Sequence, residues 1–301
     1  MPILIPNELP AYKILQEENI FLMEENRALS QDIRPIEIAI VNLMPTKIET
    51  ETQLLRLLGN SPLQVNLTFI TMETYESQNT SKNHLEQFYK GFSEIKNKKF
   101  DGMIVTGAPL EYHDYKDIKY IDELKEILEF TKSNVTSTLF ICWGAFFALD
   151  YFYNIKKELS QKKLFGVYDI LNISNYDPLL KGMDDILKVP MSRYTYLKED
   201  DIMLCKNLQI LGKSQECGSS IIKDLNFNRF FFTGHSEYDR NTLKQEYDRD
   251  IKKGLTTEKP KNYFIDEACT KVNMSWSTTA NLLFYNWLNH YVYQITPYIN
   301  L

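Results

Sequence analysis

Short apolar runs alternate with helical patterns from residue 36 to residue 146, and this alternation constrains the fold more than any other feature of the sequence. The apolar runs have the length of buried strands, and the stretches between them repeat apolar residues at helical spacing. Such chains fold as parallel sheets with helices on both faces, so we expect a doubly wound α/β domain. The expected strands cover residues 36–41, 65–70, 102–105 and 138–141, and the expected helices are one with Leu54, Leu55, Leu57 and Leu58 inward, an amphipathic one over 81–97, and one containing Ile121, Leu124, Ile127 and Leu128.

The rest of the chain has a different pattern. Residues 163–232 contain several strands and few helices, which indicates an antiparallel or mixed edge of the same domain. Residues 1–35 contain Pro2, Pro6 and Pro10, an acidic middle and little periodicity, so they predict an N-terminal arm. With no repeat or linker, the expected division is an arm over 1–35 and a single α/β domain over 36–301. The further elements expected are strands at 165–173, 186–190, 208–211, 219–225 and 229–232, and helices at 239–253 and 277–292.

The run Thr138–Phe146 ends a strand in a cysteine, and a helical pattern follows at once. A nucleophile at a strand-to-helix turn is presented in this way, with its side chain exposed at the turn. The positive end of the following helix favours the thiolate of Cys142, which is the reactive form of a cysteine. The alternative is a buried structural cysteine at the end of a core strand.

A candidate base lies in Phe230–Asp239, where another apolar strand ends in Gly234 and His235. In extended chain, alternate residues share a face, so His235 and Glu237 point into one pocket. A Cys–His pair with a carboxylate that orients the imidazole is a generalised catalytic triad. A turn histidine and a solvated or helix-starting glutamate are the alternatives, but together with Cys142 the two residues predict a Cys142–His235–Glu237 triad.

The composition excludes several classes of function. A net charge of −6 and a pI near 5.4 argue against a nucleic-acid or anionic-membrane partner. The four cysteines and four histidines are scattered, so neither a metal site nor a bound cofactor is expected. No apolar run has the length of a membrane span, and the N-terminus does not have the pattern of a signal peptide. We therefore expect a cytoplasmic protein.

Nearly the whole chain resembles the homoserine O-acyltransferases of methionine biosynthesis, whose fold is flavodoxin-like and of the class I glutamine amidotransferase type. Each matching segment is weak alone, but their combination in this order is specific. The segments are Val41–Pro45, Lys47–Glu51, Thr106–Pro109, Cys142–Ala145, Lys163–Val167, Ser192–Thr195, Gly234–Tyr238, Asn262–Phe264 and Asn281–Phe284.

The resemblance implies that an acyl group moves from acyl-CoA to the hydroxyl of L-homoserine through a thioester on Cys142. His235 is then the general base and Glu237 orients it. Substrate contacts are implied for Lys163, Ser192 and Arg249, and an arginine can hold the homoserine carboxylate bidentately. Relatives of this kind also suggest a homodimer. The only small molecules expected are homoserine and acyl-CoA.

Two further assignments concern the acyl group. The tetrahedral oxyanion needs backbone donors, and the expected ones are the N–H groups of Trp143 and Leu110. Glu111 is the expected selector of the donor, because the resembling family has glutamate there in acetyl-preferring members and glycine in succinyl-preferring ones. Its carboxylate would repel the distal carboxylate of a succinyl group by about 4 kcal/mol at roughly 4 Å in an effective dielectric near 20.

The sequence therefore predicts a homoserine O-acetyltransferase that uses acetyl-CoA. Three alternatives stay open: a succinyltransferase that uses succinyl-CoA, a glutamine amidotransferase-type hydrolase on the same fold, and a ligand-sensing relative without activity. The lack of a synthetase domain weakens the amidotransferase interpretation, and the presence of Cys142, His235 and Glu237 weakens the sensor interpretation.

Overall fold

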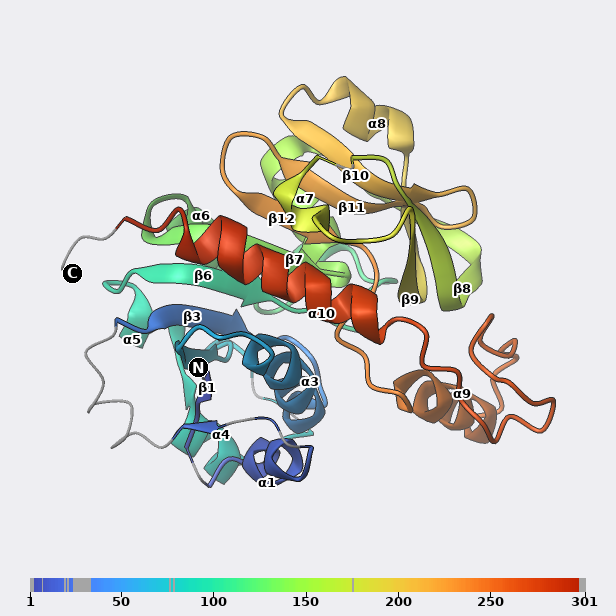
Figure 1. Ribbon diagram of the computed structural model, residues 1–301, viewed down its shortest axis with the longest axis horizontal. Coiled ribbons are helices and arrows are strands. Elements are labelled where there is room, and N and C mark those ends of the chain that lie inside the picture. Colours follow the sequence, from blue (N-terminus) through green and yellow to red (C-terminus); the bar gives the residue numbers. More distant parts are fainter. Residues whose placement is uncertain are drawn as a thin grey trace.

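A single mixed sheet forms the centre of the molecule in the computed structural model, which describes residues 3–6, 8–18, 20, 22–23, 34–75, 77, 79–174 and 176–297. The sheet has twelve strands in the order β2-β1-β4-β3-β6-β7-β12-β11-β10-β8-β9, with β5 paired to β4. Helices cover both faces (Figure 1), which confirms the expected fold class. The strands are β1 (Ile3–Leu4), β2 (Leu22–Met23), β3 (Ile36–Val41), β4 (Val65–Ile70), β5 (Tyr89–Lys90), β6 (Phe100–Val105), β7 (Val135–Ile141), β8 (Lys157–Asn172), β9 (Ile186–Leu197), β10 (Leu208–Ser214), β11 (Gly218–Asp224) and β12 (Arg229–Phe232).

The half of the sheet from β4 to β12 is parallel. Strand β3 pairs in parallel with β4 and β6, and β7 pairs in parallel with β6 and β12. The carboxyl ends of these strands therefore meet at one edge, where α/β sheets bind their ligands. The other half, β12-β11-β10-β8-β9, is antiparallel. The expected antiparallel or mixed edge is confirmed, and the structure shows that it belongs to the same sheet as the parallel half.

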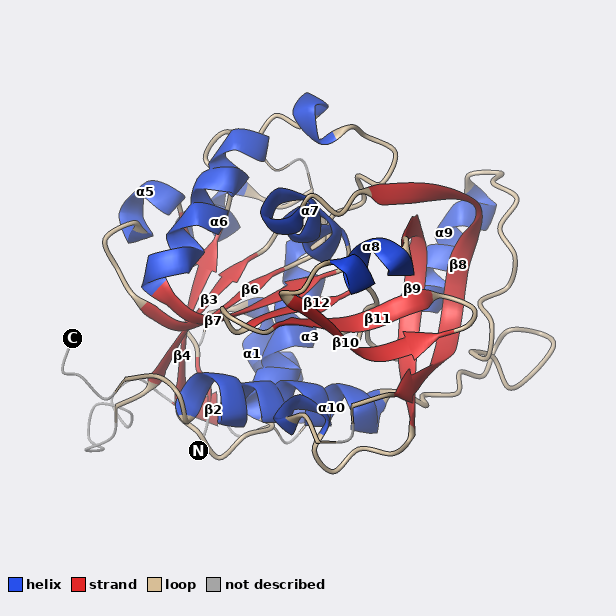
Figure 2. Ribbon diagram, turned by 90° about the horizontal axis from the view of Figure 1, so that it is seen from above, coloured by secondary structure: helices blue, strands red, loops and turns tan. Residues whose placement is uncertain are grey.

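Two apolar layers separate the sheet from its helices. One layer lies under α1 (Pro10–Glu17), α3 (Lys47–Gly59), α10 (Ser277–Asn286) and the π-helical turn η3 (Trp287–Tyr293). The other lies under α6 (Ile121–Asn134) and α7 (Trp143–Tyr153). Figure 2 shows α6 and α7 on one side of the sheet and α1 and α10 on the other. The remaining helices are α4 (Lys82–Phe88), α5 (Phe92–Ile95), η1 (Tyr115–Asp117), η2 (Pro178–Leu180), α8 (Glu199–Leu204) and α9 (Thr242–Lys252).

The expectation of one continuous helix over 81–97 is wrong. Strand β5 interrupts it, and Tyr89 pairs with Phe69 of β4. The Tyr89 hydroxyl is buried, donates to Glu51 at 2.6 Å and accepts from the Asn42 amide at 2.9 Å. A helix through Tyr89 would withdraw its hydroxyl from these two buried polar groups, which is costly.

The described part of segment 1–35 contacts the main sheet. Strand β1 pairs in parallel with β4, and α1 packs on α3. Leu9 and Leu15 are buried in the core. The division into an arm and a domain stays a prediction, but these residues share the apolar core of the sheet.

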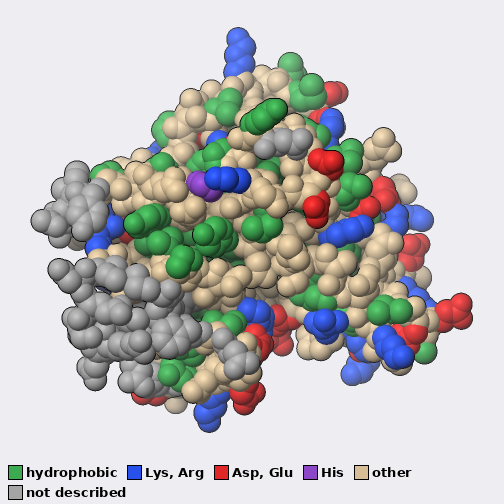
Figure 3. Space-filling view, in the orientation of Figure 1, with side chains coloured by type: hydrophobic (Ala, Val, Ile, Leu, Met, Phe, Trp, Pro, Cys, Tyr) green, Lys and Arg blue, Asp and Glu red, His purple; other side chains and the backbone are tan. Residues whose placement is uncertain are grey.

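Acidic and basic side chains are interspersed over the face shown in Figure 3, most densely around α9. No helix within the described ranges is long and apolar enough to cross a membrane.

Candidate active site

Cys142 occupies the turn between β7 and α7 in a strained backbone conformation, with φ 47° and ψ −118°. Such a φ is rare for a residue with a side chain and often marks a functional site. Its N–H donates to the Phe232 carbonyl of β12 at 2.7 Å, and its carbonyl accepts from the Phe146 N–H at 3.0 Å. A Cβ on Gly144 would lie 2.6 Å from the Thr106 carbonyl oxygen, so glycine is required for this close approach. The expected strand–cysteine–helix turn is confirmed.

His235 and Glu237 follow β12 and are both buried. The imidazole Nδ1 lies 2.7 Å from Oε1 of Glu237, which leaves Nε2 free to face Cys142. Burial on its own would lower the pKa of His235, but the neighbouring Cys142 and Glu237 side chains raise that pKa well above its ordinary value. This environment favours the charged imidazolium form of His235.

The loop after β6 lies beside Cys142 and His235. A Cβ added to Gly107 would lie 3.2 Å from Cβ of Cys142 and 3.5 Å from Cε1 of His235. The carboxyl ends of β6, β7 and β12 therefore meet at one point, as the parallel half of the sheet requires.

The sequence analysis missed two residues that line the same cavity as His235, namely Tyr238 and Glu246. The Tyr238 ring stacks on the imidazole with ring centroids 4.2 Å apart, and its hydroxyl donates to Oε1 of Glu246 at 2.8 Å. The hydroxyl of Ser192 donates to Oε2 of Glu246. A sequence signal for Glu246 exists, because it lies three residues before Arg249 on the same face of α9.

A cavity of about 640 Å³ opens onto Cys142 and His235. Its walls also include the four other side chains expected around the substrate, namely Glu111, Lys163, Ser192 and Arg249. The structure thus brings these residues together from β8, β9, α9 and the loop after β6. A cavity of this size can enclose a small molecule.

The charged groups of this cavity are paired with one another. The Lys163 ammonium lies 3.2 Å from Oδ2 of Asp250 and 3.6 Å from Oε2 of Glu246, and it lies 4.1 Å from the centre of the Phe165 ring. Arg249 donates to Oδ1 of Asp250 from both Nε and an Nη, at 3.0 and 2.9 Å. Two cations and two carboxylates thus stand on one wall, a charge distribution that suits a zwitterion.

Glu111 lines the same cavity from the loop after β6. Its Oε1 accepts from the Tyr194 N–H at 3.3 Å, and its main-chain carbonyl accepts from the Lys157 ammonium at 2.6 Å. Burial raises the pKa of its carboxyl, against the opposing effects of the Tyr194 N–H and the Lys163 charge. The Glu111 side chain is therefore fixed in the wall of the cavity that Cys142 and His235 line.

One expected oxyanion donor needs correction. The Trp143 N–H is at the first position of α7, where no acceptor exists within the helix, so it fits the role. The Leu110 N–H instead donates to the Ala108 carbonyl at 2.9 Å and is not available. The loop turns back on itself there, a feature that spacing along the chain does not reveal. In the described part of the chain, the Ala108 N–H has no hydrogen-bond acceptor and is the better candidate.

No group of three or more His, Cys, Asp or Glu side chains in the described ranges is arranged to hold a metal ion.

The structure places a cysteine, a histidine and a glutamate at the carboxyl edge of a doubly wound sheet, and the fold is of the class I glutamine amidotransferase-like type. A glutamine amidotransferase from Thermotoga maritima has this fold, with a TM-score of 0.55 and 11% identity over 87% of this chain and 100% of that chain.

The chain belongs to the homoserine O-succinyltransferase family, whose model matches residues 2–298. A relative named homoserine O-acetyltransferase from Clostridium tetani is 54% identical, over 99% of this chain and 98% of the relative. Another of the same name from a Geobacillus species is 53% identical, over 99% of both chains.

Proposed function

We propose that this protein transfers an acetyl group from acetyl-CoA to the hydroxyl of L-homoserine through a thioester on Cys142. The observation that carries the proposal is one cavity that holds Cys142, His235 and the zwitterion-binding wall. The two relatives named homoserine O-acetyltransferase, each more than 50% identical over the full length, support the same activity.

In the first half-reaction, the Cys142 thiolate attacks the thioester carbonyl of acetyl-CoA. The backbone N–H groups of Trp143 and Ala108 stabilise the oxyanion. The bond from the carbonyl carbon to the CoA sulfur breaks, and the departing thiolate takes the proton of the His235 imidazolium. Free CoA leaves, and the acetyl group remains on Cys142 beside a neutral imidazole.

In the second half-reaction, neutral His235 takes the hydroxyl proton of homoserine while its oxygen attacks the acetyl-enzyme. The bond from the carbonyl carbon to the Cys142 sulfur breaks, and the imidazolium–thiolate pair is restored. Glu237 keeps the imidazole oriented and stabilises its charged form.

The amino-acid substrate fits the charged wall of the cavity. Arg249 is half exposed there and can hold the homoserine carboxylate by two hydrogen bonds in place of its contact with Asp250. Glu246 and Asp250 are acceptors for the homoserine ammonium group. Ser192 and Lys163 contact these carboxylates and complete the substrate contacts.

The acetyl preference rests on Glu111. The side chain lines the cavity of Cys142, so it reduces the space for a larger acyl group, and its charge opposes the distal carboxylate of succinate. The steric part of this effect does not depend on ionisation. The cytoplasmic location and the homodimer stay predictions.

The test is a comparison of acetyl-CoA and succinyl-CoA with homoserine as acceptor. We expect a higher kcat/KM with acetyl-CoA, release of CoA before homoserine reacts, and one acetyl group on Cys142 by intact-protein mass. Glu111→Gly should shift the preference toward succinyl-CoA.

Cys142→Ser should remove both acylation and transfer, while Cys205→Ser and Cys269→Ser retain them. Hydrolysis of glutamine without acyl transfer would instead support an amidotransferase. A wild-type preference for succinyl-CoA would overturn the donor assignment, and an unchanged preference in Glu111→Gly would remove Glu111 as the selector.

A further inference from the structure

A second cavity, of about 250 Å³, lies beside the catalytic one. It is formed at the carboxyl ends of β3, β4 and β6, along the same ligand-binding edge of the sheet. The two cavities share four wall residues, Met44, Pro45, Ala108 and Pro109. The second cavity therefore adjoins the site of Cys142, and the Ala108–Pro109 loop forms part of the wall of both cavities.

The walls of the second cavity are mainly apolar. Met72, Ile118 and Tyr120 are buried there, and the Tyr75 ring packs edge-on against Tyr120 with centroids 5.6 Å apart. Apolar walls suit an uncharged chain and do not suit an amino-acid zwitterion. In contrast, the cavity of Cys142 has a wall that carries Lys163 and Arg249 together with Glu246 and Asp250.

Among the described residues in the wall of this second cavity, Lys47 is the one buried charged side chain, and its ammonium already has partners. Its ammonium donates to the Asn42 carbonyl and lies 5.4 Å from the centre of the Tyr89 ring. Burial lowers its pKa to about 8. Exposed side chains, among them His113, Asp117 and Lys119, stand at the rim, so the cavity opens to solvent at its far end.

The size of the cavity limits what it can hold. Pockets for whole drug-sized ligands span about 300–1,000 Å³. A volume of about 250 Å³ is below that range and fits an arm of a larger molecule. The larger molecule must then extend past the rim, and its other end must reach the catalytic cavity.

From this geometry we propose, on the basis of the proposed function, that the second cavity binds the pantetheine arm of the acyl-CoA donor. The arm runs from the rim along Tyr75 and Ile118, and the thioester passes the Ala108–Pro109 loop to reach Cys142. The nucleotide of CoA stays outside the cavity. Homoserine occupies the charged wall on the α9 side, so donor and acceptor have separate binding regions.

The experiment fills the cavity and compares three acetyl donors with homoserine as acceptor. Thr71 lines the cavity at the end of β4 and is partly buried, so Thr71→Trp places a large ring in the path of the arm. The donors are acetyl-CoA, acetylpantetheine, which lacks the nucleotide, and the acetyl thioester of N-acetylcysteamine, which lacks most of the arm. We expect kcat/KM to fall about tenfold or more for the first two donors and far less for the third, with an unchanged KM for homoserine.

A second variant removes part of the wall of the second cavity, whereas Thr71→Trp fills its space. Tyr75 is 41% exposed, so Tyr75→Ala should fold normally. In this variant kcat/KM should again fall more for acetyl-CoA and acetylpantetheine than for the N-acetylcysteamine thioester. Each fall should be smaller than in Thr71→Trp. The matched control is Tyr176→Ala, which removes a fully exposed tyrosine from the loop before η2 and should leave all three donors unaffected.

Equal losses with all three donors in both variants would overturn the proposal, because the damage would then be general. Wild-type rates with acetyl-CoA in Thr71→Trp would also overturn it, because the arm would then lie elsewhere. These outcomes leave the proposed function intact. A wild-type enzyme that accepts no acyl donor would instead refute the proposed function itself.

Discussion

His235 is held on three sides by groups with different effects. Glu237 binds Nδ1 at 2.7 Å, the Tyr238 ring stacks on one face, and Cys142 lies toward the remaining nitrogen. The two acidic groups favour the charged imidazole, whereas the buried setting opposes it. Glu237 therefore helps to stabilise the imidazolium form of His235 that faces Cys142.

Replacing the base tests this dependence. His235→Asn should lower kcat/KM by about 10²–10⁴-fold, because proton transfer by a positioned side chain contributes about that much. The same change should slow alkylation of Cys142 by iodoacetamide at pH 7, because the positive neighbour of the thiolate is lost. Initial rates and alkylation rates give the two readouts.

Glu237→Gln is the matched comparison, since glutamine keeps the size of the side chain without its charge. It should cost less than His235→Asn, because Glu237 orients the imidazole and does not transfer the proton. Wild-type rates in His235→Asn between pH 6 and 9 would exclude His235 from the mechanism.

The positions of Cys142, His235 and Glu237 after strand ends were predictable because short-range patterns reveal them, whereas their catalytic roles stay a prediction. Cys142 ends one apolar run, and His235 and Glu237 follow another. Tyr238 and Glu246 were not predicted. The stacking of Tyr238 on His235 and the contacts of Glu246 with Tyr238 and Ser192 depend on the folded chain, and the spacing of Glu246 from Arg249 is only a weak signal. Leu110 was wrongly chosen as a donor because the spacing of residues gives no sign that its N–H turns back to Ala108.

At the scale of elements, β12 carries His235 to the site, and a buried charge lies at the other end of this strand. Arg229 is 4% exposed, stacks on the Phe152 ring at 3.9 Å and pairs with Asp224 of β11 at 3.5 Å. Asp224 also accepts from the Tyr153 hydroxyl and from the Asn226 N–H. The connection between β11 and β12 is therefore fixed by one satisfied buried pair.

Removing one partner of this pair should be costly. Asp224→Ala should lower the free energy of unfolding by about 3–5 kcal/mol, because it leaves a buried guanidinium without its counter-charge. Denaturant unfolding measures this loss. In the double variant Asp224→Ala/Arg229→Met the cost should be less than the sum of the single costs.

The matched control is Asp122→Ala, which breaks an exposed pair with Lys125 on α6. Exposed pairs contribute about 0–1 kcal/mol, so this change should be small. Equal losses of unfolding free energy in Asp224→Ala and Asp122→Ala would show that burial does not increase the contribution of the Arg229–Asp224 pair to stability.

The elements that were predicted well are those with local patterns, namely β3, β4, β7 and β12. Strands β8 and β9 are longer than expected, because they pair with each other over Lys157–Leu171 and Ile186–Leu197 and polar residues enter the ladder. The helical pattern over 81–97 gave the wrong result because the buried hydroxyl of Tyr89 needs partners on other elements. Such long-range pairing leaves no periodic signal in one chain.

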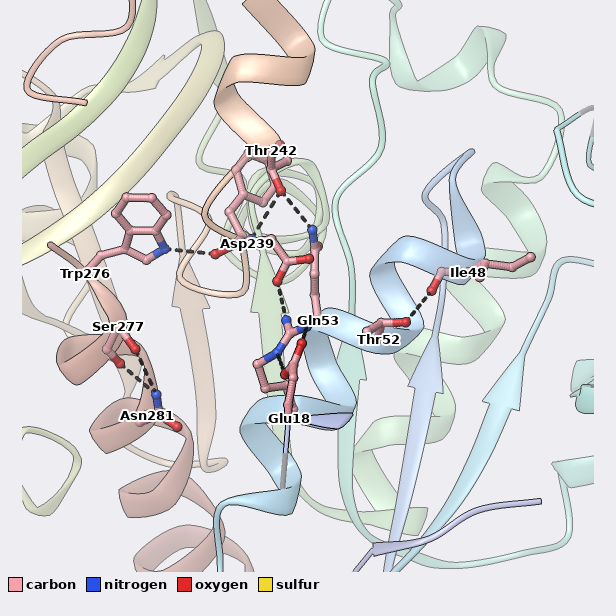
Figure 4. A network of polar contacts seen from close by, with 11 residues as sticks. Glu18, Ile48, Thr52, Gln53, Asp239, Thr242, Trp276, Ser277 and Asn281 are labelled. Atoms are coloured by element: carbon pink, nitrogen blue, oxygen red, sulfur yellow. Dashed lines mark hydrogen bonds and ion pairs between the residues drawn. The ribbon is translucent and has the colours of Figure 1, made fainter. Parts of the chain in front are cut away.

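At the scale of the whole molecule, the N-terminal segment is connected to the loop that follows His235. Arg56 of α3 contacts both Glu18, after α1, and Asp239, four residues after His235. Figure 4 shows this network, in which Gln53 also donates to the Thr242 hydroxyl at 3.0 Å. The start of the chain, α3 and the start of α9 are thus joined by side-chain contacts.

The apolar packing of α1 gives the last prediction. Leu15 is fully buried between α1 and the core, whereas its neighbour Ile14 is 40% exposed. Leu15→Ala should lower the free energy of unfolding by about 2–5 kcal/mol, the range for large-to-small changes in a core. Ile14→Ala, a change of similar size on the other side of the helix, should stay within about 0.5 kcal/mol. Denaturant unfolding of both variants decides whether the segment acts as part of the fold. Equal, small effects would mean that residues 1–35 behave as a loose arm, and a large effect for Leu15→Ala alone would mean that α1 folds as part of the α/β domain.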